Sequence, residues 1–130
     1  MDLKFTYPDP LLEHSARKSQ AWYEIFCSYM NYRNDVFAEN GFVALPKIIC
    51  NLDDGGRPRW ETSKFRTEVQ VLVRAIRDSG TFAAILVQKR DDGMYLVLDG
   101  HHRLAAWPQL SDSWLVPAVV VTVSTRVPTF

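Results

Sequence analysis

Apolar residues recur at helical spacing in two stretches of the chain. Residues 11–32 carry one apolar stripe with three- and four-residue steps, made of Trp22, Ile25, Phe26, Tyr29 and Met30. This stripe predicts a helix. Residues 65–76 carry a second stripe, which predicts the clearest helix of the chain. Thr62 or Ser63 is suited to cap the start of that helix, and Gly80 is suited to end it.

Shorter apolar runs bounded by turn residues predict strands. The runs are residues 48–50, 83–87, 94–98 and 116–123. The turn residues Asp91, Asp92 and Gly93 predict a tight hairpin between the second and third runs. In the last run, Pro117 indicates either the beginning of the strand or an edge position, because proline has no N–H to donate. The pair at residues 40–41, Asn-Gly, predicts a break in regular structure before the first run.

Composition and charge fit one compact globular domain. The chain has 130 residues, 47% of them hydrophobic and 23% charged, which suits a single domain. No apolar run is long enough to cross a membrane, and the N-terminus lacks the features of a secretory signal. Fifteen basic and fifteen acidic residues leave no net charge. Nucleic acid is therefore not expected as the main ligand, since its binding depends on a positive field.

The cysteines and histidines do not predict a metal centre. Cys27 and Cys50 are too few for a disulfide scaffold and are not spaced as metal ligands. We expect both to be free core thiols of a cytoplasmic protein, where thiols stay reduced. His101 and His102 are adjacent, so their side chains point in different directions, and only His14 remains as a third histidine.

Residues 95–107 predict a strand joined to a helix through a glycine turn. The apolar run ends at Asp99, Gly100 makes the turn, and a helix begins around Arg103. The first turn of a helix has N–H groups without intrahelical partners and carries partial positive charge. Gly100 leaves room for a ligand, His101 and His102 add donors, and Arg103 is suited to hold a phosphate with two hydrogen bonds. The segment therefore predicts an anion site that suits phosphate.

The same segment resembles a known family. Residues 98–106, Leu-Asp-Gly-His-His-Arg-Leu-Ala-Ala, resemble the signature of the ParB/sulfiredoxin superfamily. The resemblance extends over about residues 48–123, because the predicted helix, hairpin and closing strand follow the family's order. It implies an α+β fold with a small mixed β-sheet flanked by helices. We therefore expect a nucleotide-binding core in residues 46–130 and a helical extension, packed on that core, in residues 1–45.

The resemblance implies a nucleotide ligand. Members of the superfamily bind adenine or cytidine nucleotides through this loop, which implies ATP, ADP or CTP. The Asp-Gly-His-His-Arg form is most similar to the free serine kinase branch, which implies phosphoryl transfer to a small hydroxyl compound such as serine, or nucleotide hydrolysis. A sulfiredoxin has Cys where this chain has His101, so reduction of a sulfinic acid is not expected. The chain stops at Phe130, soon after the last predicted strand, so we do not expect the DNA-binding domains of a partition protein.

The motif predicts roles for individual residues, and the resemblance to the kinase branch adds a role for Glu61. The phosphate-binding residues would be Gly100, His101, His102, Arg103 and Arg59. The catalytic residues would be Glu61, Asp99 and His101, with Glu61 as the base that takes the hydroxyl proton and Asp99 as a ligand of Mg²⁺.

Simpler roles suit several of these residues equally well. Asp99 is suited to cap the following helix, and Glu61 to lie exposed in the first turn of a helix. Arg59 is also suited to an ordinary surface position. Trp60 and Trp107 flank the motif and are suited either to stack on a base or to pack in the core.

Two other function classes fit the same residues. The first is a non-catalytic module that senses a nucleotide or docks a partner, in a phage, plasmid or regulatory protein. The N-terminal segment favours it, because the superfamily core does not need that segment and a protein partner could bind there. The second is a nuclease, against which the zero net charge counts. Turnover of a nucleotide would distinguish the enzyme from the module, and no membrane partner is expected.

Overall fold

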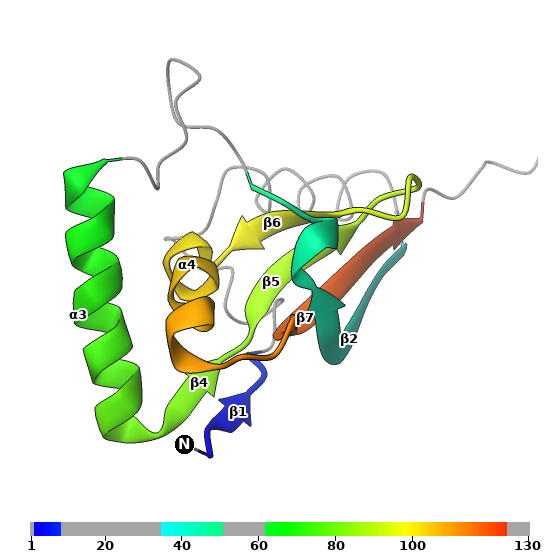
Figure 1. Ribbon diagram of the computed structural model, residues 1–130. Coiled ribbons are helices and arrows are strands. Elements are labelled where there is room, and N and C mark those ends of the chain that lie inside the picture. The colour runs from blue at the N-terminus through cyan, green and yellow to red at the C-terminus, as the bar shows by residue number, and fades with distance from the viewer. Residues whose placement is uncertain (1, 9–34, 51–61, 125–130) are drawn as a thin grey trace, which may run out of the picture.

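The structure, a computed structural model, describes residues 2–8, 35–50 and 62–124. Its strands are β1 (Lys4–Thr6), β2 (Asp35–Ala44), β3 (Ile48–Ile49), β4 (Thr81–Ala83), β5 (Ile85–Lys89), β6 (Tyr95–Asp99) and β7 (Leu115–Ser124). Its helices are α3 (Ser63–Ser79) and α4 (His101–Leu110), with a short 3-10 helix η1 (Leu45–Lys47). Five strands form a mixed sheet in the order β2-β7-β5-β6-β3, and β1 and β4 form a separate parallel pair (Figure 1). The predicted α+β class, a small mixed sheet flanked by helices, is confirmed.

Most of the predicted strands are present in this sheet. The runs at residues 48–50, 94–98 and 116–123 correspond to β3, β6 and β7, each within one residue at either end. The hairpin between β5 and β6 is also confirmed. In its turn the Asp92 carboxylate accepts the Met94 N–H at 2.9 Å, and Gly93 adopts a φ of 82°. The run at residues 83–87 is divided, because β4 pairs with β1 whereas β5 pairs with β6 and β7.

The expected break at residues 40–41 is wrong. Strand β2 continues through Asn40 and Gly41 and is paired with β7 along its whole length. Hydrogen bonds to a neighbouring strand outweigh the local preference of an Asn-Gly pair for a turn. Residues 35–44 therefore contribute a strand to the same sheet as β3, β5, β6 and β7. The division of the chain at residues 45 and 46 stays a prediction.

Pro117 lies near the beginning of β7, as one alternative predicted, but the edge position is wrong. Strand β7 lies between β2 and β5. The Leu45 N–H donates to the Trp114 carbonyl at 2.8 Å, and the antiparallel register then makes Phe42 and Pro117 a pair without hydrogen bonds. Pairing with β5 begins only at Ala118. The missing N–H of proline therefore interrupts neither ladder.

The helix α3 follows its sequence signals closely. Thr62 is the N-cap and its hydroxyl accepts the Phe65 N–H at 3.1 Å. Gly80 ends the helix with a φ of 70°, and its N–H donates to the Ile76 carbonyl at 2.8 Å. The apolar stripe faces inward, with Phe65 and Ile76 buried at its two ends. The predicted helix of residues 11–32 lies outside the described residues.

Helix α4 packs on one face of the sheet, and α3 packs beside α4 and runs in the same direction (Figure 1). The main core cluster joins Ile76 of α3 and Trp107 of α4 to sheet residues such as Ile85 and Val116. Trp107 is buried and its indole N–H donates to the Ser113 carbonyl at 2.9 Å. Of its two predicted roles, Trp107 therefore has the core one. The parallel course places the N-terminal ends of α3 and α4 at the same end of the molecule.

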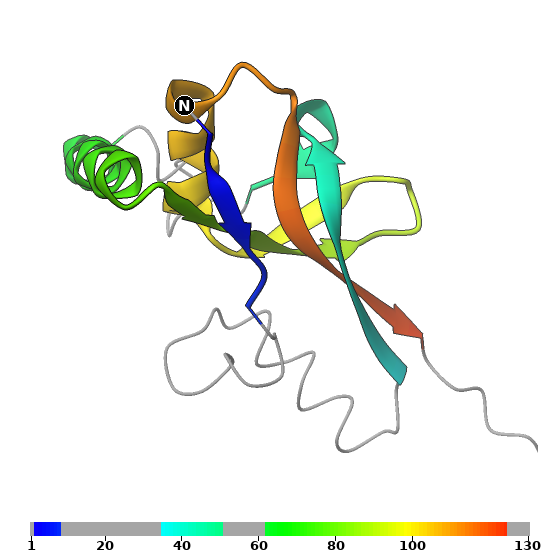
Figure 2. The ribbon, with the colours of Figure 1, turned by 90° about the horizontal axis from the view of Figure 1, so that it is seen from below.

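Other apolar residues pack on the opposite face of the sheet and between the helices. The opposite face has a cluster of Ala84, Leu86, Leu98, Val119 and Val121. The interface between the helices is made of Phe65, Val69, Val73 and Ala106. Seen from below, β1 lies alongside β4 (Figure 2). Within the part of the chain described, neither helix is long and apolar enough to cross a membrane.

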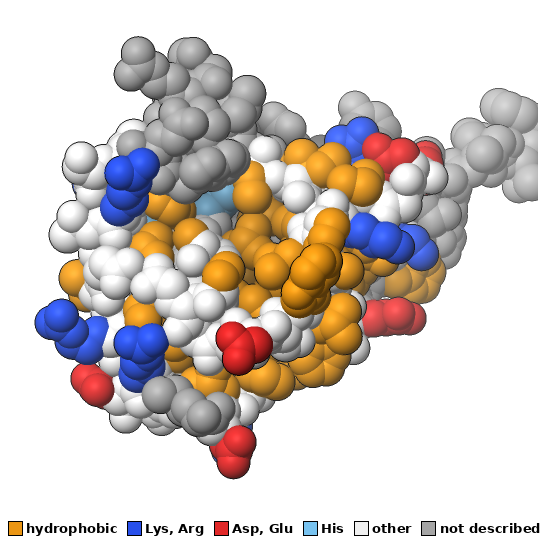
Figure 3. Space-filling view, in the orientation of Figure 1, with side chains coloured by type: hydrophobic (Ala, Val, Ile, Leu, Met, Phe, Trp, Pro, Cys, Tyr) orange, Lys and Arg blue, Asp and Glu red, His pale blue; other side chains and the backbone are white. Residues whose placement is uncertain are grey.

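Apolar side chains also reach the surface near β2 and the start of β7. The large exposed ones there are Phe37, Phe42, Trp114 and Leu115. Figure 3, in the orientation of Figure 1, shows apolar side chains gathered over η1 and the strands next to it.

Candidate functional site

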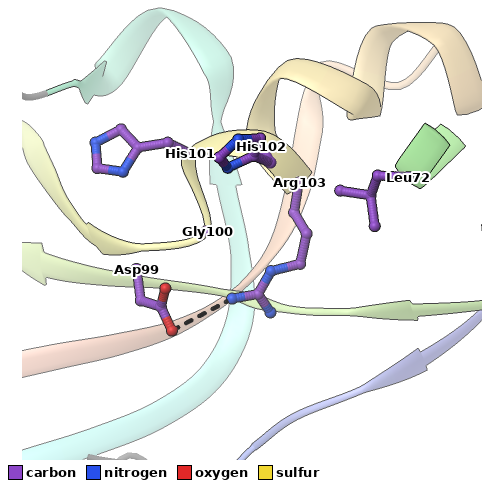
Figure 4. Close-up of a pocket in the computed structure, with 6 residues that line it drawn as sticks. All are labelled: Leu72, Asp99, Gly100, His101, His102 and Arg103. Atoms are coloured by element: carbon purple, nitrogen blue, oxygen red, sulfur yellow. Dashed lines mark ion pairs between the residues drawn. The ribbon is translucent and has the colours of Figure 1, made fainter. Parts of the chain in front are cut away.

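Five consecutive motif residues line one pocket at the N-terminal end of α4. The pocket has a volume of about 330 Å³ and is lined by Leu72, Asp99, Gly100, His101, His102 and Arg103 (Figure 4). Strand β6 ends at Asp99, Gly100 is the N-cap of α4, and the other three motif residues form the first helical turn. The Gly100 carbonyl accepts the Leu104 N–H at 2.8 Å and closes that turn. The leading N–H groups of α4, which have no acceptor within the helix, therefore lie at this pocket.

Gly100 is required by backbone conformation and by packing. Its φ is 104°, a region that side-chain-bearing residues rarely adopt. A Cβ at this position would lie 2.9 Å from Cγ2 of Ile85 and 3.0 Å from Nη2 of Arg103. The space that the glycine leaves is thus already filled by the protein. That Gly100 also leaves room for a phosphate stays a prediction.

The Arg103 guanidinium is bound to the protein backbone. Its Nη1 donates to the carbonyls of Ala83 at 3.2 Å and Ala84 at 2.8 Å, and its Nη2 lies 3.6 Å from Oδ2 of Asp99. The Ala84 N–H in turn donates to the Thr6 carbonyl of β1 at 2.8 Å. Arg103 therefore fastens the start of α4 to the junction of β4 and β5. Its role as a phosphate ligand stays a prediction, and the structure adds a structural role.

The two histidines point in different directions, as expected for adjacent residues (Figure 4). Nε2 of His102 lies 2.9 Å from Oε2 of Glu68 on α3, and the His102 ring packs 4.4 Å from the ring of Phe65. The His101 ring points away from α3, and its Nε2 is buried. His102 is therefore held by α3, whereas His101 faces the sheet side of the loop.

Asp99 reaches the pocket just after an irregularity in the sheet. Leu86 pairs with Asp99 and Val87 pairs with Val97, so β6 has one extra residue before Asp99. The N-cap of α4 is Gly100, so Asp99 does not occupy the capping position that one interpretation gave it. Mg²⁺ is commonly held by one or two carboxylates together with nucleotide phosphates, and the single carboxylate of Asp99 fits that mode. Among the residues described, no three His, Cys, Asp or Glu side chains form a metal-binding group.

Some predicted residues cannot be placed, and some residues at the site were not predicted. Arg59, Trp60 and Glu61 lie outside the described residues. Glu68 and Leu72 reach the site from α3, although only Leu72 belonged to a predicted pattern, the apolar stripe of that helix. No sequence signal pairs Glu68 with a histidine more than 30 residues away, because only the packing of α3 on α4 brings them together.

Cys50 behaves as a partly buried thiol at the margin of the core. It packs against the main core cluster, and burial raises the pKa of its thiol. The thiol is accordingly less ionised at neutral pH than an exposed one. Cys27 lies outside the described residues.

Comparison with known proteins gives a match over most of the chain. The model of the ParB N-terminal domain family matches residues 47–128. No curated protein matches the sequence significantly.

Solved structures give partial matches of low sequence identity. A free serine kinase variant in complex with AMP is 22% identical with a TM-score of 0.47, over 64% of this chain and 31% of that chain. A conserved hypothetical protein from Pyrococcus furiosus is 23% identical with a TM-score of 0.47, over 63% of this chain and 32% of that chain. A C-terminally truncated chromosome-partitioning protein ParB from Caulobacter crescentus, complexed with CTP-gamma-S, is 25% identical with a TM-score of 0.44, over 63% of this chain and 43% of that chain. This chain thus spans less than half the length of each of these structures.

Proposed function

We propose, from the premise that this chain belongs to the ParB N-terminal domain family, that it binds ATP, ADP or CTP with the phosphates in the pocket at the start of α4. The observation that carries the proposal is that five consecutive motif residues, Asp99 to Arg103, line that one pocket. Its volume of about 330 Å³ falls in the range of small-molecule sites. The resemblance of the motif to nucleotide-binding loops of the superfamily supports the same ligand class.

The charges and donors at the pocket suit a polyphosphate. The N-terminal end of α4 carries the partial positive charge of the helix dipole, which favours an anion. Arg103 places a full positive charge beside the pocket and is kept there by two carbonyls. His101 and His102 line the same pocket and point in different directions (Figure 4). Asp99 would hold Mg²⁺, which neutralises phosphate charge when it is bound.

We propose further that the bound nucleotide undergoes phosphoryl transfer to a small hydroxyl compound such as serine, or hydrolysis. Glu61 is the proposed base that accepts the proton of the attacking hydroxyl, and His101 is proposed to donate to the phosphates. Such a reaction needs mainly positioning and charge stabilisation. The protein would then be a nucleotide-dependent kinase or a nucleotidase.

Calorimetric titration tests the binding step. Each of ATP, ADP and CTP is titrated with and without Mg²⁺ into the wild type, Arg103→Ala and Arg90→Ala. Arg90 is the matched control, because it also pairs with an aspartate, Asp92 at 2.9 Å, but lies in the hairpin turn. We expect at least about tenfold weaker binding for Arg103→Ala, from loss of a charge-assisted contact, and wild-type affinity for Arg90→Ala. Absence of wild-type binding to all three nucleotides would refute the proposal, as would equal affinity in the two variants.

Product analysis then tests the chemical step. The nucleotide that binds is incubated with Mg²⁺, with and without serine, and the products are separated by anion-exchange chromatography. An enzyme is supported if the wild type forms a nucleoside diphosphate or monophosphate and the Asp99→Asn variant does not. Binding without any product would refute phosphoryl transfer and favour a nucleotide-sensing module.

A further inference from the structure

We propose that Glu68 is a positioning residue of the nucleotide site, which acts by fixing the imidazole of His102. The inference rests on the proposed function, because it concerns the same pocket. Glu68 is not one of the residues that line the pocket, whereas His102 is. Any effect of Glu68 on a bound phosphate must therefore pass through His102 or through space.

The geometry restrains the His102 ring on two sides. Its Nε2 lies 2.9 Å from the Glu68 carboxylate, and its ring packs on Phe65 at a centroid distance of 4.4 Å with an interplanar angle of 36°. Both contacts come from α3, the helix that runs beside α4. Phe65 is buried and forms a fixed surface for the ring. A neighbouring helix thus restrains the orientation of a histidine at the start of α4.

This contact fixes which ring nitrogen of His102 is turned toward Glu68. A carboxylate only accepts hydrogen bonds, so Nε2 of His102 must carry the proton that it shares with Glu68. The other ring nitrogen, Nδ1, is then the one that does not contact Glu68, and His102 also lines the pocket. Carboxylates that orient the histidines of binding sites commonly act in this way, by fixing the tautomer and the ring plane. Glu68 accordingly prepares His102 to donate from Nδ1 to a phosphate when the imidazole is protonated.

The sign of a mutational effect separates positioning from simple charge. Glu68 is negative, so its field alone repels phosphate, and its removal would strengthen phosphate binding if only the charge mattered. A positioning role predicts weaker phosphate binding when Glu68 is removed. The His102 ring then moves more freely, and the ligand must order it at a cost in entropy. Glu68→Ala removes both the charge and the acceptor, whereas Glu68→Gln removes the charge and keeps an acceptor oxygen of the same size.

Titration of ADP, CTP and inorganic pyrophosphate tests the proposal. We expect Glu68→Ala to weaken binding of the nucleotide and of pyrophosphate by about tenfold, and Glu68→Gln to restore most of the affinity. Asp78→Ala is the control, because Asp78 is an exposed acid at the far end of α3, and it should leave binding unchanged. Equal or tighter binding by Glu68→Ala would overturn the proposal. Thermal unfolding of each variant checks that the variant is folded at the temperature of the titration.

A second readout needs no nucleotide. Nitrogen NMR of the His102 ring in the ligand-free protein reports which nitrogen carries the proton. We expect a protonated Nε2 in the wild type and a mixed signal in Glu68→Ala. An unchanged His102 spectrum would overturn the positioning role even if nucleotide binds. Failure of the wild type to bind ADP, CTP or pyrophosphate would instead refute the proposed function, and this inference with it, whatever the spectrum shows.

Discussion

Substitution of Gly100 by alanine tests the packing of the loop most directly. The backbone φ of 104° is unfavourable for alanine, which costs about 1–3 kcal/mol. The new Cβ would also lie 2.9 Å from Cγ2 and 3.1 Å from Cβ of Ile85. Ile85 is completely buried, so it cannot move aside easily, and overpacking of this kind costs about 1–3 kcal/mol. Together the two effects predict a loss of about 2–6 kcal/mol in the free energy of unfolding.

Gly80→Ala separates the two contributions. Gly80 also has a positive φ, 70°, but a Cβ there would meet no atom within 4 Å. It therefore shows only the conformational cost, about 1–3 kcal/mol. The gain from restricting the unfolded chain is the same for both substitutions and cancels in the comparison.

Urea unfolding followed by circular dichroism measures both variants. We expect Gly100→Ala to lose more stability than Gly80→Ala by about 1–3 kcal/mol, with unchanged dependence on urea concentration. Failure of Gly100→Ala to fold, when Gly80→Ala folds, would agree with this expectation. Equal losses in the two variants would show that Ile85 does not restrict the loop, and the packing argument would be wrong.

Three further predictions concern single contacts. Arg103→Ala should lower the free energy of unfolding by about 1.5–3 kcal/mol in urea titrations, because a charged donor to the Ala84 carbonyl is lost; unchanged stability would contradict the structural role. Thr62→Ala should cost about 1 kcal/mol, through loss of the cap on the Phe65 N–H, and Thr62→Ser should restore it. Burial raises the pKa of the Cys50 thiol, so iodoacetamide at pH 8 should alkylate it more slowly in folded than in urea-unfolded protein. Equal alkylation rates in folded and unfolded protein would contradict the raised pKa. The contribution of this pKa shift to stability is fully present below the unfolded-state pKa and is lost as the pH rises through the folded-state pKa.

Local signals were sufficient for α3 and for the β5–β6 hairpin. The periodic apolar stripe, the Thr62 hydroxyl and the glycine at position 80 each act within a few residues of the chain. The turn that contains Asp92 and Gly93 is equally local. Because these interactions join near neighbours in sequence, the sequence predicts them without knowledge of the rest of the fold.

The strand β2 shows where local signals fail. Asn40 and Gly41 favour a turn by themselves, yet both are paired with β7, Asn40 with Val119 and Gly41 with Ala118. The partner strand lies more than 70 residues further along the chain, and its hydrogen bonds decide the conformation. Pro117 shows the same effect, because only the register of β7 between β2 and β5 reveals that its missing N–H costs nothing.

The sequence by itself determined the chemistry of the site: a strand, a glycine and a helix start with two histidines and an arginine, in an order that resembles the ParB/sulfiredoxin superfamily. Only the tertiary structure decided how those side chains are used. Arg103 donates to carbonyls of Ala83 and Ala84, and His102 meets Glu68. The reason is physical: a motif fixes which donors and charges are near one another along the chain, whereas the packing of α3, α4 and the sheet fixes which acceptors those donors reach.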